Sequence, residues 1–289
     1  MKAFKSELLL LTTAIIWGFS FVAQRIAMEF LEPLLFNGIR FLLGAVSLLP
    51  IILFLQNEKF TKQNFFYGLI AGFIIFVAAL LQQIGIKFTT AGKAGFITGL
   101  YVILVPIIGI ALKRKTPKKL WLSSLIAIVG LYLITQTDNS YILKGDFLVF
   151  IGAFFWALHV LFMDKIAKNI SIITIAFFQF SVAAILNLTI GFLLEDFSFD
   201  NIMKAKIPLL YGGISSIGIA FTLQIFGQRK AHPSHAAVIL SLEGAFAVLG
   251  GWLILHETLS LRGIVGCSLM LFAIILPQIL KKEKATEVA

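Results

Sequence analysis

The chain has 289 residues, of which 59% are hydrophobic and only 13% are charged. A soluble protein carries roughly 25% charged residues, and a mean hydropathy of +0.98 leaves too little polar surface to cover a water-soluble globule. The composition argues against a soluble enzyme, and the net charge of +10 comes from short basic clusters between apolar runs rather than from a nucleic-acid-binding surface, so we expect no nucleic-acid partner.

Apolar runs bounded by charged residues recur along the whole chain. A bilayer core of roughly 30 Å needs about 20 helical residues, and ten runs have this length, which predicts an all-α integral membrane protein with ten transmembrane helices. In chain order the predicted helices are Glu7–Met28, Pro33–Leu55, Asn64–Ile86, Gly92–Leu112, Lys119–Gln136, Asp146–Met163, Ser171–Leu194, Ile207–Gln228, Ser234–His256 and Leu261–Leu280.

The distribution of Lys and Arg between the predicted loops indicates the orientation. With the amino terminus in the cytoplasm, 16 basic residues lie on the cytoplasmic side and 7 on the outer side, with Arg40 inside a helix. Because cytoplasmic loops carry the excess of Lys and Arg, we predict a multi-pass protein of the cell (inner) membrane with both termini in the cytoplasm.

Part of the chain matches another part at a constant offset. With an offset of 142, residues 78–116 align with residues 220–258 without a gap. The matches include Gln82 with Gln224, which is a rare coincidence in an apolar composition. This self-similarity predicts that the chain is built from two related halves.

A second match, with an offset of 139, pairs Trp17 with Trp156 near the starts of the two halves. We therefore predict five-helix repeats over residues 1–140 and 141–289 that together form one transmembrane domain. Because five is odd, the second repeat enters the membrane from the opposite side. Two inverted five-helix repeats are a transporter architecture, with the substrate site near the membrane midplane between them.

Several motifs resemble the EamA branch of the drug/metabolite transporter superfamily across essentially the full chain. The motifs are Ala14-Ile-Ile-Trp-Gly-Phe-Ser-Phe21, Arg40-Phe-Leu-Leu-Gly44, Leu242-Glu-Gly-Ala-Phe-Ala247, Gly250-Gly-Trp252 and His256-Glu-Thr-Leu-Ser260. The resemblance implies a ten-helix secondary carrier that exports or exchanges small polar metabolites, often amino acids or related compounds, by alternating access. The chain departs from the family pattern at Glu243-Gly244, where Glu-Pro is common, and at Lys113-Arg114-Lys115, where an acidic residue is common.

Three ionisable residues fall inside predicted helices, where a charge costs at least about 2.5 kcal/mol. Glu243 lies midway along the ninth helix, and either couples transport to protons or is a buried structural carboxyl. Arg40 lies seven residues into the second helix, and either binds an anionic solute group, pairs with Glu243, or extends to the outer interface. His159, midway along the sixth helix, either relays protons or is a neutral hydrogen-bonded histidine.

Polar and aromatic side chains at helical spacing predict a solute-binding cavity. Their alternative role is to fill interhelical space, and the amides Gln82 and Gln224 are the stronger candidates because lipid supplies no hydrogen-bond partner. The predicted substrate-binding residues are Trp17, Ser20, Gln24, Gln82, Thr98, Tyr101, Trp156, His159, Gln179, Gln224 and Glu243.

No motif indicates a cofactor, a metal or a nucleotide. The single cysteine, Cys267, leaves no Cys-based metal site, and a Gly-rich loop ending in Lys-Ser or Lys-Thr is missing. The predicted function is secondary transport of a small organic solute, with protons as a candidate coupling ion. A lipid or lipid-linked sugar flippase is the first alternative, and a membrane-embedded enzyme is the less favoured one because no paired catalytic groups occur. The sequence does not determine the substrate or the oligomeric state.

Overall fold

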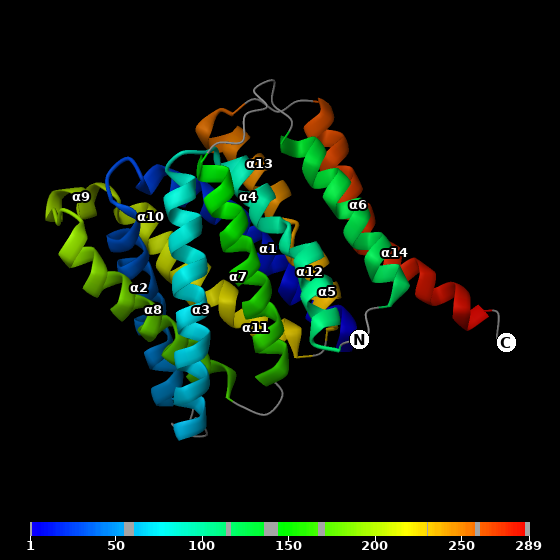
Figure 1. Cartoon of the computed structure of the whole chain (residues 1–289), viewed down its shortest axis with the longest axis horizontal. Helices are drawn as coiled ribbons and strands as arrows, with labels where there is room; N and C mark the ends of the chain where they lie inside the picture. Colours follow the sequence, from blue (N-terminus) through cyan, green and yellow to red (C-terminus); the bar gives the residue numbers. More distant parts are fainter. Residues whose placement is uncertain are drawn as a thin grey trace.

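A computed structural model describes residues 2–54, 61–113, 117–135, 144–166, 171–229, 231–257 and 261–286, and these residues form helices joined by short turns (Figure 1). The predicted boundary between the halves, at residues 140 and 141, lies outside the described residues. The elements are α1 (Lys2–Ala27), α2 (Pro33–Phe54), α3 (Lys62–Ile86), α4 (Ala91–Gly99), α5 (Tyr101–Ala111), α6 (Lys118–Thr135), α7 (Lys144–Ile166), α8 (Ile172–Leu194), α9 (Phe199–Lys204), α10 (Lys206–Leu210), the π-helix η1 (Tyr211–Ala220), α11 (Phe221–Gln228), α12 (Pro233–Leu240), α13 (Glu243–Leu255) and α14 (Leu261–Thr286).

Eight helical segments are long and apolar enough to cross a membrane, so the chain is a multi-pass membrane protein. They are Phe4–Ala27, Pro33–Phe54, Lys62–Ile86, Ala91–Ala111, Lys144–Ile166, Ile172–Leu194, Lys206–Gln228 and Pro233–Leu255. The predicted fifth and tenth spans correspond to α6 and α14, which pack against each other at one edge of the molecule (Figure 1). These two helices are not among the eight, so the count of ten stays a prediction.

Side-chain hydrogen bonds cap the first turns of several helices, including α3 and α4. The hydroxyl of Thr61 accepts a hydrogen bond from the Asn64 amide at 3.1 Å, and the hydroxyl of Thr90 accepts one from the Lys93 amide at 3.2 Å. These caps fix where α3 and α4 begin.

Neighbouring helices pack closely through glycine. A Cβ atom added to Gly72 of α3 would lie 2.7 Å from the carbonyl oxygen of Gln179 in α8. Likewise, a Cβ on Gly85 would lie 2.6 Å from the carbonyl oxygen of Gly145 in α7. Larger residues at these two positions would push α3 away from α7 and α8.

The predicted fourth and ninth helices are each divided in two. The division falls at Leu100 between α4 and α5, and at Ser241 and Leu242 between α12 and α13. Leu100 and Leu242 are 142 positions apart, which is the offset of the internal match. Both divisions lie midway along their spans, and a residue of the cavity described below directly follows each one.

Proline and a π-helix divert further backbone carbonyls from regular helical bonding. Pro106 has no amide hydrogen for the carbonyl of Val102, which instead accepts a hydrogen bond from the Ser124 hydroxyl of α6 at 3.2 Å. In η1, the carbonyl of Ser216 accepts a hydrogen bond from Trp17 Nε1 at 3.2 Å. π-Helical segments are rare and often occur at functional sites, and η1, which is ten residues long, forms one wall of the cavity.

Candidate functional site

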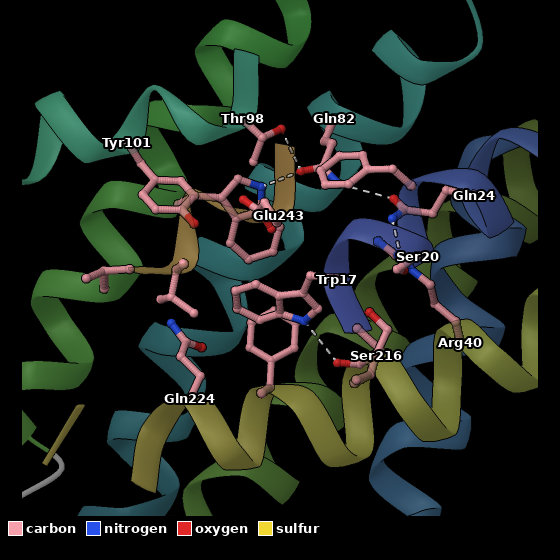
Figure 2. Close-up of a pocket in the computed structure, with 16 residues that line it drawn as sticks. Trp17, Ser20, Gln24, Arg40, Gln82, Thr98, Tyr101, Ser216, Gln224 and Glu243 are labelled. Carbon is pink, nitrogen blue, oxygen red and sulfur yellow. Dashed lines mark hydrogen bonds between the residues drawn. The ribbon is translucent and has the colours of Figure 1, made fainter. Parts of the chain in front are cut away.

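A cavity lies in the middle of the helical bundle, between α1, α2, α3, α4, α5, α7, η1, α11, α12 and α13 (Figure 2). Its volume of about 40 Å³ is room for a few water molecules. The lining residues are Trp17, Ser20, Phe21, Gln24, Arg40, Gln82, Thr98, Tyr101, Trp156, Val160, Ser216, Ile217, Phe221, Gln224, Leu240 and Glu243.

Most of the lining consists of pairs of residues separated by the two offsets of the internal match. The offset of 139 relates Trp17 to Trp156 and Phe21 to Val160, and the offset of 142 relates Gln82 to Gln224, Thr98 to Leu240 and Tyr101 to Glu243. Each member of a pair approaches the cavity from a different half of the chain.

Nine of the eleven predicted substrate-binding residues line this cavity, and Arg40 lines it as well. His159 and Gln179 do not. They lie behind the lining, where His159 Nε2 and Gln179 Oε1 are 3.1 Å apart and both side chains are fully buried. Whether any of the lining residues binds solute stays a prediction.

Gln82 is the centre of a hydrogen-bond network that joins four helices (Figure 2). Its Oε1 accepts hydrogen bonds from Trp156 Nε1 at 2.7 Å and from the Thr98 hydroxyl at 3.3 Å. Its Nε2 donates to Gln24 Oε1 at 3.1 Å, and Gln24 Nε2 donates to the Ser20 hydroxyl at 3.2 Å. The network holds the upper part of the cavity wall in Figure 2 in a fixed arrangement.

Gln224, the residue matched to Gln82, has no such partners. Its side chain is 1% exposed, it borders the cavity at the end remote from Gln82 (Figure 2), and its Oε1 has no hydrogen-bond partner. A buried amide without a partner is costly. Gln224 therefore offers unused hydrogen-bonding capacity to a molecule in the cavity.

Glu243 and Tyr101 meet at the two helix divisions. Each is the first residue after a division, and the Tyr101 hydroxyl interacts electrostatically with the Glu243 carboxyl (Figure 2). The Tyr101 hydroxyl and Glu243 Oε1 nevertheless lack a partner with good hydrogen-bond geometry. The carboxyl thus faces the cavity without a cation beside it among the residues that the structure describes.

The two matched tryptophans do not face each other across open space. The Phe221 ring lies between them, with its centroid 4.7 Å from that of Trp17 and 5.7 Å from that of Trp156. It also contacts His159 at 5.9 Å and Phe180 at 5.6 Å. In this conformation a solute can therefore stack between the two tryptophans only after Phe221 moves.

Sequence reasoning missed Phe221, Ser216, Ile217, Phe21, Val160 and Leu240. Leu240 could have been found because the offset of 142 pairs it with Thr98, and Phe21 and Val160 because each lies four residues after a predicted tryptophan. Phe221 is one of 29 phenylalanines, and nothing in its local sequence distinguishes it from those that face lipid.

Two carboxylates join helix ends by hydrogen bonds on the side of the bundle opposite the amino terminus. Glu195, after α8, accepts hydrogen bonds from the amides of Leu34 and Leu35 at 2.8 and 2.7 Å, at the start of α2. Glu257, after α13, accepts hydrogen bonds from the first amides of α4. Partial burial raises the pKa of both carboxyls above the ordinary value of 4.5, although the amide donors act in the opposite direction.

Polar side-chain contacts join further helix ends on both sides of the bundle. On the side opposite the amino terminus, Lys93 Nζ lies 3.2 Å from Asp146 Oδ2. On the amino-terminal side, His235 Nε2 lies 3.1 Å from Glu7 Oε1. Each pair joins a residue of the first predicted half to one of the second, and the cavity lies between them.

Within the described parts of the chain, no three His, Cys, Asp or Glu side chains come together in a way that could hold a metal ion. The polar groups of the cavity are one guanidinium, one carboxyl, amides and hydroxyls. Such a lining is suited to recognising a small polar organic molecule.

Comparisons with known proteins identify the family of this chain. The model of the EamA-like transporter family matches residues 4–136 and again residues 143–277. An uncharacterized transporter of Archaeoglobus fulgidus is 31% identical over 96% of this chain and 86% of its own length. The uncharacterized transporter YoaV of Bacillus subtilis is 26% identical over 90% of this chain and 92% of its own.

A solved crystal structure of a protein shares the fold, with a TM-score of 0.80 over 96% of this chain and 98% of that one, at 14% sequence identity. The family model covers nearly the whole chain in two consecutive matches. The chain belongs to the EamA-like transporter family, and is thus a membrane transporter.

Proposed function

We propose that the protein is a secondary carrier that moves a small organic metabolite, such as an amino acid or a related compound, across the cytoplasmic membrane by alternating access. In this proposal it has ten transmembrane helices in two inverted repeats, both termini are cytoplasmic, and the solute is exported or exchanged. The central cavity is the solute site.

The observation that carries the proposal is the paired lining of the cavity. A site on the pseudo-two-fold axis between inverted repeats receives matched residues from both. Each of the two matched tryptophans also donates a hydrogen bond to the other predicted half. Trp17 donates to Ser216 of η1, and Trp156 donates to Gln82 of α3. The two consecutive family matches and the matched divisions of the fourth and ninth spans support the same symmetry.

Alternating access requires that the two sides of the cavity open in turn. The Glu195 and Glu257 contacts with α2 and α4 would have to break for opening on one side, and the Glu7–His235 pair for opening on the other. A cavity with room for only a few waters has to widen before it can hold an amino acid. We infer that solute entry displaces Phe221 and one of these sets of contacts.

Coupling to protons is assigned to Glu243 in this proposal, because it is the only acidic residue in the cavity lining. A carboxyl that faces a cavity and lacks a fixed cation can gain and lose a proton as the cavity changes its access. His159, which is covered by Phe221 and Trp156, is remote from the open space and is the weaker candidate.

The test is solute exchange in proteoliposomes. Purified protein is reconstituted with unlabelled metabolites inside, and uptake of radiolabelled amino acids is measured against liposomes without protein. Uptake that depends on internal solute supports a carrier. The absence of exchange for every soluble metabolite, together with movement of a fluorescent lipid between leaflets, would replace the carrier by the flippase alternative.

A further inference from the structure

Arg40 is a buried cation that has no anion beside it within the described part of the chain. Its side chain is 2% exposed, and its Nε has no hydrogen-bond partner. Among the residues that the structure describes, no carboxylate forms an ion pair with it, and no charged neighbour acts on it. Burying a charge under these conditions is strongly unfavourable, so the arrangement needs an explanation.

Neither structural explanation considered for Arg40 accounts for its position. An arginine that extends to the membrane interface leaves its charged end exposed, whereas the Arg40 side chain is almost fully enclosed. Pairing with Glu243 would place a carboxylate oxygen within 4 Å of the guanidinium, and no such pair exists between these two described residues.

Aromatic rings hold the guanidinium in place. Its Cζ atom lies 5.3 Å from the ring centroid of Phe36 and 5.3 Å from that of Phe41. Aromatic rings stabilise a cation through their faces but leave its N–H groups unbonded. The donors of Arg40 thus stay available in a side chain that lines the cavity.

Arg40 enters the cavity from the side of Ser20, away from Tyr101 (Figure 2). Gln224 and Glu243 line other parts of the same cavity, and an oxygen of each also lacks a partner. Groups without a hydrogen-bond partner therefore lie on several sides of the cavity. The single positive charge of the lining, that of Arg40, lies on one of these sides.

We propose that Arg40 is an anion subsite that binds the carboxylate of the transported metabolite, with Gln224 and Glu243 contacting the rest of the molecule. This inference rests on the proposed transport function. The planar guanidinium presents paired donors that match a carboxylate. The lining also holds one carboxyl, that of Glu243, which disfavours a doubly charged phosphate more strongly than a singly charged carboxylate.

The test compares carboxylates with amides of the same shape. Purified protein is titrated with L-phenylalanine and L-phenylalaninamide, L-leucine and L-leucinamide, benzoate and benzamide, and lactate and lactamide, and its unfolding temperature is followed. At least one carboxylate should raise the unfolding temperature in a saturable way, with an apparent affinity at least about tenfold higher than that of its amide.

The variants attribute this preference to Arg40. Arg40→Gln should weaken carboxylate binding roughly 10- to 100-fold, the scale of a charge-assisted hydrogen bond, and leave binding of the amide unchanged. Arg40→Lys retains the charge without the paired donors, so it should keep a reduced preference, and it serves as the variant if Arg40→Gln does not fold. Arg262→Gln, at an exposed arginine of α14, should behave like the wild type.

No preference for any carboxylate in the wild type, or an unchanged preference in Arg40→Gln, would overturn the proposal. Exchange of the same compounds in proteoliposomes separates this inference from the proposed function. If the wild type and Arg40→Gln exchange a solute equally well, the anion subsite is wrong and the carrier stands. If the protein binds carboxylates through Arg40 but exchanges none of them, the carrier function is wrong.

Discussion

Replacing each of the two matched glutamines with leucine should have different effects on stability. Gln82 and Gln224 are 4% and 1% exposed, so both changes place a leucine in a buried position. Gln82 makes three side-chain hydrogen bonds to three other helices, whereas Gln224 Oε1 has no partner. Only the first change therefore breaks existing bonds.

The expected loss follows from the number of bonds. Interhelical hydrogen bonds in membrane proteins contribute about 0.6 kcal/mol on average and up to about 1.7 kcal/mol. The three bonds of Gln82 thus give a loss of about 2 to 5 kcal/mol in the free energy of unfolding for Gln82→Leu. Gln224→Leu removes an unpaired buried amide, so its free energy of unfolding should change by less than about 1 kcal/mol or increase.

Unfolding by SDS in mixed micelles, followed by tryptophan fluorescence, measures both values. Gln63→Leu, at an exposed position of the same helix as Gln82, controls for the change of residue type. Equal losses for Gln82→Leu and Gln224→Leu would refute the reasoning, because they would show that the different hydrogen bonding of the two glutamines does not determine their contributions to stability.

Three further predictions concern the cavity and its closure. Trp17→Ala should weaken solute binding by about 1 to 3 kcal/mol, as measured by titration with a transported solute. Trp252→Ala, at a position 46% exposed on the outside of the bundle, should leave binding unchanged. Equal effects of the two changes would make Trp17 a packing residue. Glu243→Gln, which cannot change its charge, should abolish the pH dependence of transport in proteoliposomes while exchange continues, and an unchanged pH profile would remove Glu243 from coupling. Because burial raises the pKa of Glu195 above 4.5, the folded protein binds more protons than the unfolded one between 4.5 and the raised value, so the stability from this group falls as pH rises through that window. Glu195→Gln should flatten this part of the plot of unfolding temperature against pH, and identical curves for variant and wild type would contradict the assignment.

The parts of the fold that sequence reasoning predicted are those governed by the bilayer. Runs of about 20 apolar residues must be helical because lipid leaves no other way to satisfy the backbone, and eight such spans are present. The divisions at Leu100 and Leu242 were not predicted. Leucine is a good helix former, so neither position carries a local signal for a break in the helix.

The site was predictable to the extent that it follows the internal match. Polar residues at related positions, such as Gln82 and Gln224, were placed in the lining because a buried amide needs a partner. The sequence could not show that Gln82 is hydrogen-bonded while Gln224 Oε1 has no partner, because this difference depends on which helices are in contact in this conformation. His159 was placed in the cavity from its spacing to Trp156, but Phe221, contributed by α11, covers it.

Access to the cavity from each side of the membrane tests alternating access most directly. Ser216 lines the cavity and is 3% exposed, and the chain has a single native cysteine, Cys267. In a Ser216→Cys, Cys267→Ser variant reconstituted in oriented vesicles, a membrane-impermeant thiol reagent is applied to one side or the other, with Cys267→Ser alone as the control. The carrier predicts labelling of Cys at position 216 from both sides, slowed by a saturating transported solute. Labelling from one side only, with or without solute, would contradict it.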